Sequence, residues 1–399
     1  MSTAQPAAQA TVQAHLFCRV IDNHGDAGVC WRLARQLACE YGVAVALIMD
    51  QPAALLPLLG LAEREAMVQA RKSDGVSLYA WQEVAQGSVT LPEPDLVIEA
   101  FACELSLSCL QRMQEQHRPP LWVNLEYLSA EDWVGGCHGL ASVHPQTGLR
   151  KLFFFPGFTA QTGGLLREQG LLEAHAQWQS EAGGRAALLR DLGIAGISVA
   201  AEEMLLVSLF TYESAAVAGT LTALAQLGRP VLCLVPEGRV LTSLEQAQVL
   251  SARGQQVRDD TYQLGGLTLK VIPFLPQPDY DRLLSLCDLN LVRGEDSFVR
   301  AQWTGKPMLW HIYEQEDGAH LAKLDAFLNL YTEGMEKGLA VAVSQLWQAW
   351  NRGQDCRSLW GPVLENLPSW YRHARRWREK MAGQGDLASN LMNFYENKL

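Results

Sequence analysis

The chain of 399 residues is long enough for two domains of roughly 150 to 200 residues each. Because 48% of its residues are apolar and 19% are charged, the composition predicts a folded globular protein rather than a disordered one. The formal net charge of -11, with no clustered excess of Lys and Arg, argues against a nucleic-acid partner.

The first half of the chain predicts a parallel α/β sheet. An apolar run at 15–21 indicates a strand, and helical periodicity over 27–41 is followed by Gly42, a typical residue just beyond a helix end. A second strand at 43–49 completes a strand, helix, strand unit, which implies parallel pairing. Further strands are predicted at 96–100, 121–125 and 152–155.

A second sheet is predicted after a change of composition. The stretch 161–201 is rich in Gly, Ala, Gln and Glu and marks the change of domain. The alternation of strands and helices then restarts. Strands are predicted at 204–210, 230–235, 267–274, 289–292 and 307–312, and helices at 214–227, 280–287 and 297–304.

The last 60 residues are predicted to be helical. Their tryptophans have spacings that indicate core packing along a long helix, namely Trp347, Trp350, Trp360, Trp370 and Trp377. The densest basic run, 372–380, also has helical spacing and is interpreted as a solvated helix face. The fold class is therefore α/β, with two doubly wound Rossmann-like domains facing a cleft and a helical C-terminus. Ligands bind such folds in the crevice at the carboxyl ends of strands.

The first motif, IDNHGDAG at 21–28, runs from the end of a strand into the start of a helix. Asp22 and Asp26 lie four positions apart, and Gly25 and Gly28 permit a tight turn. Asp26 fits a structural role as an N-cap, with Asp22 as a turn former. The alternative is that both carboxylates face the cleft, one orienting a nucleophile and the other accepting its proton.

The second motif, within 273–313, places Glu295, Asp296 and Ser297 where a strand ends and a helix begins. The free N–H groups of that helix end are a suitable seat for a diphosphate, although Ser297 also fits a plain N-cap. A Glu beside a nucleotide usually binds ribose hydroxyls, so Glu295 fits a sugar clamp. Arg293 adds positive charge or forms a structural salt bridge.

Two further residues follow the strand before this motif. Phe274 and Gln277 are placed to stack on a base and to hydrogen-bond with it, whereas Phe274 taken alone fits a core position. Together these side chains predict a nucleotide site in the second domain.

Both motifs resemble those of the EarP family, the enzymes that rhamnosylate an arginine of bacterial elongation factor P. The strings that carry the resemblance are CRVIDNHGDAGVCWRLARQLA at 18–38 and VRGEDSFVRAQWTGKPMLWHIY at 292–313, and the similarity extends over essentially the whole chain. One position departs from the family pattern, since His24 stands where Phe or Tyr is expected. The resemblance implies an inverting GT-B glycosyltransferase that uses no metal or other cofactor.

The resemblance also implies the substrates and the division of labour. The donor is dTDP-β-L-rhamnose, bound by the C-terminal domain at 200–369. The acceptor is an arginine of elongation factor P, bound by the N-terminal domain at 1–165, which a helix at about 370–399 completes. Rhamnosylation activates that factor for translating polyproline stretches.

The residues that the resemblance assigns are those of the two motifs and two tyrosines. Asp26 and Asp22 are catalytic, with Asn23 and Gly25 beside them in substrate binding. For the donor, Phe274 and Gln277 meet the base and Glu295 the ribose. The diphosphate meets the backbone of Asp296 and Ser297 together with Tyr212 and Tyr313, where Arg293 is a further candidate for binding. A guanidinium is a poor nucleophile because its pKa exceeds about 12, so Asp26 must polarise and deprotonate it while Asp22 holds its second edge.

Other patterns in the sequence predict less. Asp279, Tyr280 and Asp281 form a DxD, but they open a predicted helix, so capping explains them better. Thr304, Gly305 and Lys306 lack the preceding Gly of a phosphate loop. The histidines show no ligand spacing, so no metal site is expected.

The location is predicted from what the chain lacks. Nine scattered cysteines without a CxxC pair favour reduced thiols over disulfides. No apolar run reaches about 18 residues, and the first fifteen residues have no basic or apolar segment of a signal peptide. We therefore expect a cytoplasmic protein with no membrane partner.

Three alternatives remain open at this point. The chain could be a nucleotide-sugar 2-epimerase of related fold, or a glycosyltransferase acting on a lipid or small-molecule hydroxyl. It could also be a nucleotide-sugar sensor that keeps the donor pocket and performs no chemistry.

Overall fold

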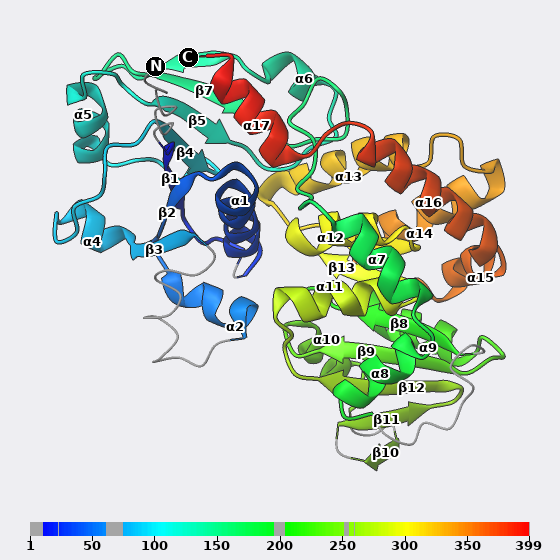
Figure 1. Ribbon diagram of the computed structural model, residues 1–399. Coiled ribbons are helices and arrows are strands. Elements are labelled where there is room, and N and C mark those ends of the chain that lie inside the picture. Colours follow the sequence, from blue (N-terminus) through cyan, green and yellow to red (C-terminus); the bar gives the residue numbers. More distant parts are fainter. Residues whose placement is uncertain are drawn as a thin grey trace, which may run out of the picture.

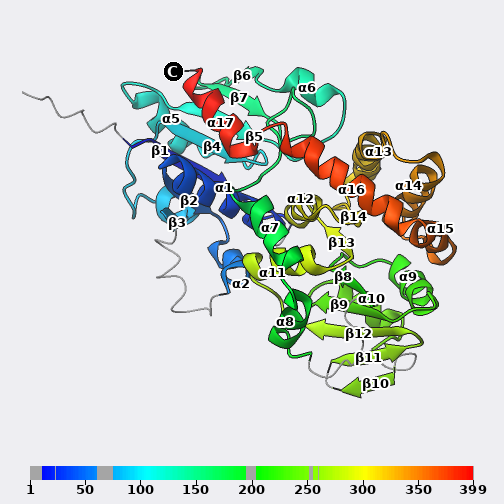
Figure 2. The ribbon, with the colours of Figure 1, turned by 45° about the vertical axis from the view of Figure 1, so that its right-hand side comes forward.

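The structure is a computed structural model that shows two α/β lobes side by side, with C-terminal helices crossing from one to the other (Figures 1 and 2). The N-terminal lobe contains strands β1 to β7, and the C-terminal lobe contains strands β8 to β14. The residues described are 11–22, 24–60, 75–194, 204–250, 255–258 and 260–398.

The sheet of the N-terminal lobe has the order β3-β2-β1-β4-β5-β7-β6. All neighbouring strands pair in parallel except β6 with β7. The bounds are β1 Gln13–Cys18, β2 Ala44–Met49, β3 Val76–Ala80, β4 Leu96–Ala100, β5 Leu121–Leu125, β6 Ala141–Val143 and β7 Arg150–Phe154.

The sheet of the C-terminal lobe has the order β10-β11-β12-β9-β8-β13-β14. The five strands β12, β9, β8, β13 and β14 pair in parallel. At one side of the sheet β10 and β11 are added by antiparallel pairing. The bounds are β8 Leu205–Leu209, β9 Val231–Pro236, β10 Gln255–Arg258, β11 Thr261–Leu264, β12 Leu267–Ile272, β13 Leu289–Arg293 and β14 Met308–His311.

Helices connect these strands and form the C-terminal segment. In the N-terminal lobe they are α1 Gly25–Tyr41, α2 Leu56–Leu59, α4 Trp81–Ala85, α5 Leu107–Glu115 and α6 Trp133–Cys137. The segment between the two sheets contains α7 Leu171–Ser180 and α8 Gly184–Asp191. The strands of the second sheet are connected by α9 Ala216–Ala225, α10 Val240–Gln246, α11 Gln277–Leu286 and α12 Asp296–Thr304. The last are α13 Ala319–Tyr331, α14 Lys337–Asn351, α15 Trp360–Glu365, α16 Leu367–Ala382 and α17 Leu387–Glu396.

Each sheet reverses its strand order at one strand, which fixes where a ligand crevice opens. In the N-terminal lobe β1 lies between β2 and β4, and in the C-terminal lobe β8 lies between β9 and β13. Ligands of doubly wound folds bind at the carboxyl ends of such switch strands. The predicted GT-B arrangement of two doubly wound domains is confirmed. The first motif follows the switch strand β1, and the second contains β13, the neighbour of the switch strand β8.

The first predicted strand is longer than the observed one. It was expected over 15–21, but β1 ends at Cys18. Beyond that point Val20 N–H donates to the Asp50 carboxylate at 2.9 Å, and Ile21 N–H donates to Asp26 at 2.8 Å. Side-chain acceptors therefore replace the sheet ladder, and the chain turns towards the other lobe.

The C-terminal segment is helical, as predicted, and its tryptophans are core residues. Trp347, Trp350, Trp360 and Trp370 are fully buried, and Trp377 is 4% exposed. Helix α17 packs against α1 of the N-terminal lobe, while α16 packs against α12 of the C-terminal lobe. The chain thus returns to the first lobe after building the second (Figure 1).

A buried ion network joins α1 of one lobe to α11 and α12 of the other. The Arg32 guanidinium forms a fork with Asp281, at 2.9 and 3.0 Å, and its Nε donates to Asp296 at 2.7 Å. Arg300 grips the same Asp281 carboxylate at 2.7 and 3.1 Å. Glu168, from the segment between the lobes, pairs with both arginines. Of the DxD residues, Asp279 lies in the first turn of α11, whereas Asp281 anchors this network.

Three further features concern the cysteines, the surface of α16 and the length of the helices. All nine cysteines are free thiols. The exposed side of α16 carries the basic run, with its tryptophans turned inward. No helix in the part of the chain that the structure describes has the length and apolar character needed to cross a bilayer.

The ion network predicts a large effect of one substitution. Arg32→Met removes a nearly fully buried charge and leaves Asp296 without its cation, so we expect a loss of about 3 to 5 kcal/mol in unfolding free energy, measured by urea denaturation. Arg282→Met is the matched control because its pair with the exposed Asp191 should be worth less than about 1 kcal/mol. Equal losses in the two variants would contradict the importance of the network.

Candidate active site

Asp26 organises the loop that precedes α1. Its Oδ2 accepts hydrogen bonds from the N–H groups of Ile21 and Asp22, at 2.8 and 2.9 Å, and the side chain is buried. Helix α1 begins at Gly25, and His24 occupies the N-cap position. The prediction that Asp26 is an N-cap is therefore wrong, since it bonds backwards to the loop and not to the first turn.

Asp22 connects the two lobes. Its Oδ2 accepts a hydrogen bond of 2.5 Å from the hydroxyl of Tyr212, which follows β8 in the C-terminal lobe. Its backbone oxygen accepts from Gly25 N–H at 2.6 Å, which closes the turn into α1. Asp22 is thus fixed at both ends.

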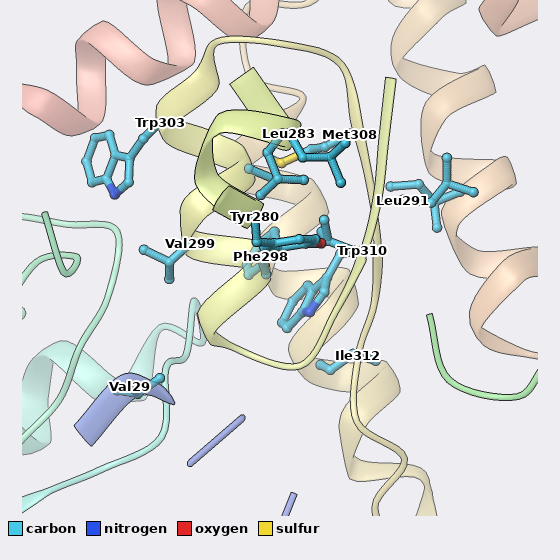
Figure 3. Packing of buried hydrophobic residues seen from close by; sticks show 14 of the residues in the cluster. Val29, Tyr280, Leu283, Leu291, Phe298, Val299, Trp303, Met308, Trp310 and Ile312 are labelled. Carbon is cyan, nitrogen blue, oxygen red and sulfur yellow. The ribbon is translucent and has the colours of Figure 1, made fainter. Parts of the chain in front are cut away.

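Gly294 provides the space in which Asp22 and Tyr212 meet. Its φ is +59°, and a Cβ atom there would lie 2.7 Å from Asp22 Oδ2 and 2.9 Å from the Tyr212 hydroxyl. The Trp310 indole donates to the Gly294 carbonyl at 2.7 Å, and Trp310 stacks on Phe298 with ring centres 3.9 Å apart (Figure 3). Position 294 therefore requires a glycine, and the Trp310 hydrogen bond fixes its backbone.

A pocket lies on one side of the Asp22 and Tyr212 contact, and we call it the aromatic pocket. Its lining comprises Asp22, His24, Gly25, Leu58, Phe210, Pro236, Phe274, Leu275, Gln277, Tyr280, Arg293, Asp296 and Ser297. Phe274 is half-exposed, and its ring centre lies 5.1 Å from that of His24 and 6.0 Å from that of Phe210. His24, where the family pattern expected Phe or Tyr, still contributes an aromatic ring.

Three buried polar atoms on residues of the aromatic pocket have no hydrogen-bond partner among the described residues. They are Arg293 Nη1, Gln277 Oε1 and the Tyr280 hydroxyl. Gln277 uses its Nε2 to donate to Gly28 O and Asp296, so its carbonyl oxygen is the atom left over. Buried groups of this kind are usually satisfied, which makes a polar ligand the expected partner.

The start of α12 also faces the aromatic pocket. Glu295 holds the N-cap position, so the prediction that Ser297 is the cap is wrong. The Ser297 hydroxyl instead donates to the Arg293 carbonyl and accepts from Arg293 N–H, which ties the turn. The Asp296 carboxylate is occupied by Arg32 and Gln277, so it belongs to the ion network.

A second pocket of about 270 Å³ lies on the other side of the contact, and we call it the acidic pocket. Its lining comprises Ile21, Asp22, Gly25, Asp26, Tyr127, Leu128, Gly294, Glu295, Trp310, Ile312, Tyr313, Gln315 and Lys323. Glu295 accepts a 2.9 Å hydrogen bond from Leu128 N–H. Burial, reinforced by the neighbouring Asp26, raises the pKa of Glu295 to about 8, and burial also raises the pKa of Asp26.

The structure separates residues that the sequence grouped together. Glu295 and Tyr313 were expected with the donor-binding side chains, but both line the acidic pocket and not the pocket of Phe274. Glu295 follows β13 and Tyr313 follows β14, but both residues lie on the opposite side of the Asp22 and Tyr212 contact from Phe274. Asn23 lies outside the described residues. Among the residues that are described, no group of three or more His, Cys, Asp or Glu side chains is placed to hold a metal ion.

The sequence matches the family described as Elongation-Factor P (EF-P) rhamnosyltransferase EarP over residues 14–396. The chain belongs to the EarP family. It is 47% identical to the protein-arginine rhamnosyltransferase of Pseudomonas aeruginosa, over 96% of this chain and 99% of that relative. The same enzyme of Pseudomonas putida is also 47% identical, over 96% of this chain and 98% of the relative.

A solved structure supports the assignment. It is described as "Structural basis for EarP-mediated arginine glycosylation of translation elongation factor EF-P", and it is 35% identical with a TM-score of 0.67. The match covers 98% of this chain and 100% of that chain. As a member of the EarP family, this chain is a glycosyltransferase.

Sequence reasoning missed three residues of this EarP family site. Gly294 lies within the second motif, but only the structure shows that Asp22 and Tyr212 occupy the space that a side chain at position 294 would need. Tyr127 follows β5, and Lys323 lies on α13, far along the chain from either motif. The position of Tyr127 after a strand end was a usable signal, whereas nothing local in the sequence marks Lys323.

A substitution at Gly294 separates the effect of backbone strain on stability from the effect of site geometry on activity. Gly294→Ala forces Asp22 and Tyr212 apart, so we expect transferase activity to fall about 100-fold. Gly334→Ala is the matched control because Gly334 has a φ of +72° with nothing within 4 Å of its Cβ position. Both variants should lose about 1 kcal/mol of stability from backbone strain. Full activity of Gly294→Ala would contradict the role given to this contact.

Replacement of Glu295 by Gln should stabilise the folded protein to an extent that depends on pH. Its carboxyl ionises at an ordinary value of 4.5 in the unfolded chain and at about 8 in the folded protein, so ionisation costs stability as pH rises between these values. Glu295→Gln removes that cost. We expect its melting temperature to exceed that of the parent at about pH 9 and to equal it at about pH 4. The exposed Glu365→Gln should show no such difference, and an identical profile for both variants would rule out the burial of an ionisable Glu295.

Proposed function

We propose that this chain transfers L-rhamnose from dTDP-β-L-rhamnose to an arginine of elongation factor P, with inversion and without a metal. The observation that carries the proposal is that a pocket suited to a nucleotide and a pocket suited to a guanidinium meet at Asp22, which lines both. The description of the family supports rhamnose as the transferred group and elongation factor P as the acceptor, and the resemblance of the two motifs implies dTDP as the carrier of the sugar. Modification would then serve the translation of polyproline stretches, as the family implies.

The aromatic pocket supports binding of the donor nucleotide. The half-exposed Phe274 offers a ring face to thymine, and Gln277 Oε1, which accepts no hydrogen bond from the described residues, suits the thymine N3–H. The pocket holds only about 50 Å³, less than the roughly 300 Å³ typical of ligand sites, so Phe274 and His24 must move apart on binding.

Arg293 and the start of α12 support stabilisation of the diphosphate. The Arg293 Nη1 is unpartnered among the described residues, and the guanidinium lies over the Phe210 ring at 4.4 Å. Fixed N–H donors and an oriented cation stabilise charge that develops on a leaving group. These groups allow the diphosphate to depart without a metal.

The acidic pocket supports binding of an arginine side chain. Three carboxylates, from Asp22, Asp26 and Glu295, line it, and a planar guanidinium pairs with carboxylates through two parallel hydrogen bonds. An uncharged sugar or lipid hydroxyl would not offset this concentration of negative charge. The acidic pocket therefore favours an arginine acceptor over the alternatives.

Asp26 would act as the base in a single displacement. A guanidine nitrogen attacks the anomeric carbon, the bond from that carbon to the diphosphate oxygen breaks, and the electron pair leaves with dTDP. The proton of the attacking nitrogen passes to Asp26. Burial raises the pKa of Asp26, which makes its carboxylate a better proton acceptor than an exposed one.

The decisive experiment is intact-mass analysis of elongation factor P incubated with the enzyme and dTDP-β-L-rhamnose. We expect a gain of one deoxyhexose on an arginine with the parent enzyme, and none with Asp26→Asn, whose affinity for the donor should stay nearly unchanged. Asp50→Asn is the matched control because Asp50 supports the same loop through Val20 N–H but lines neither pocket.

Two results would contradict the proposal. Full transfer by Asp26→Asn would remove the assignment of the base. Consumption of the donor with no mass gain on elongation factor P would favour a 2-epimerase or a small-molecule transferase, and donor binding without consumption would favour a sensor.

A further inference from the structure

The acidic pocket contains one cation among its described lining residues, and it comes from neither motif. Lys323 lies on α13, which follows β14 by a short 3-10 turn. Its neighbour Leu324 is fully buried, so the backbone of α13 is fixed at this point. The ammonium group therefore reaches the pocket on a flexible stem from a rigid helix.

Tyr127 positions the Lys323 ammonium at the pocket. The Nζ atom lies 5.8 Å from the centre of the Tyr127 ring, within the range of a cation–π contact. Phe101 stacks on the same ring at 4.4 Å with an interplanar angle of 14°, which holds Tyr127 in place. Within the part of the chain that the structure describes, no carboxylate lies within 4.0 Å of Lys323, so it is not fixed by an ion pair.

The pocket would otherwise concentrate charges of one sign. Glu295 is faced by Asp26 and Asp22 from the loop before α1, by Tyr127 after β5, and by Lys323 from α13. Like charges at short range oppose simultaneous ionisation, and a nearby cation offsets that effect. Lys323 lowers the pKa of both Glu295 and Glu126, against the larger effect of burial.

We propose that Lys323 is a positioning residue of this site, the resident counter-charge that offsets the acidic groups of the pocket until a cationic acceptor binds. It acts through Glu295 and performs no step of the transfer itself. When the guanidinium enters, it supplies the positive charge in place of Lys323, and the long lysine side chain swings outwards. This inference rests on the proposed function of the acidic pocket.

The test is the pH profile of kcat/KM for elongation factor P with Lys323→Met and Lys323→Arg. Loss of the cation makes ionisation harder, so we expect the acid limb of the Lys323→Met profile to move to higher pH by about 0.5 to 1 unit. Activity should fall about three- to tenfold near pH 7 and approach that of the parent at about pH 9.5. Lys323→Arg should restore the parent profile.

Two comparisons keep this test specific. Lys380→Met removes a lysine that also lies 5.8 Å from an aromatic ring, that of Trp377, but far from the pocket, and it should leave the profile unchanged. The melting temperatures of all variants are measured alongside, to detect any folding defect. A Lys323→Met profile that is lowered uniformly, or that coincides with the parent, would overturn the proposal.

The Asp26→Asn variant in the same assay separates the two levels of argument. If it is inactive while Lys323→Met behaves like the parent, only the role of Lys323 fails. If Asp26→Asn retains full transfer, the assignments of the base and of the acidic pocket as the acceptor site fail, whereas a parent enzyme that adds no deoxyhexose to elongation factor P would end the proposed function.

Discussion

The buried carboxylate of Asp281 is the constraint on which the rest of the site depends. It accepts Arg32 from one lobe and Arg300 from the other, so α1 and α12 are held at a fixed separation. The loop that precedes α1 carries Asp22 and the start of α12 borders both pockets. Because a buried ion pair loses stability steeply when one partner moves, the two helices shift together or not at all. Cleft geometry is therefore determined by charge pairing.

The acidic pocket shows the opposite use of buried charge. Burial raises the pKa of both Asp26 and Glu295, and Asp26 adds to the shift at Glu295. Among the described residues of the pocket, backbone N–H donors and Lys323 counteract these shifts. Such an arrangement costs stability in the empty protein and favours a cationic ligand. The ion network nearby compensates for this cost, since it fixes the backbone that presents the carboxylates. Stability and reactivity are thus assigned to adjacent sets of acidic residues.

Sequence reasoning reached the fold and the two motifs because both depend on local patterns. Strand and helix periodicity predicts the two sheets, and the carboxyl ends of their parallel strands place Asp22 at the edge of the first sheet and Arg293 at the edge of the second. The strands β3, β6, β10 and β11 were missed because they are short, with three to five residues each. The roles of Asp296 and Glu295 could not be predicted, since both carboxylates follow the same strand and only their distant partners separate them.

The central claim is that the nucleotide pocket opens onto the carboxylates through Asp22. A crystal structure of the Asp26→Asn variant with dTDP-β-L-rhamnose tests it most directly. The account predicts thymine against Phe274, the diphosphate beside Arg293 and the start of α12, and the anomeric carbon facing the acidic pocket. A sugar directed away from Asp22, with no lobe movement able to bring the two together, would contradict it.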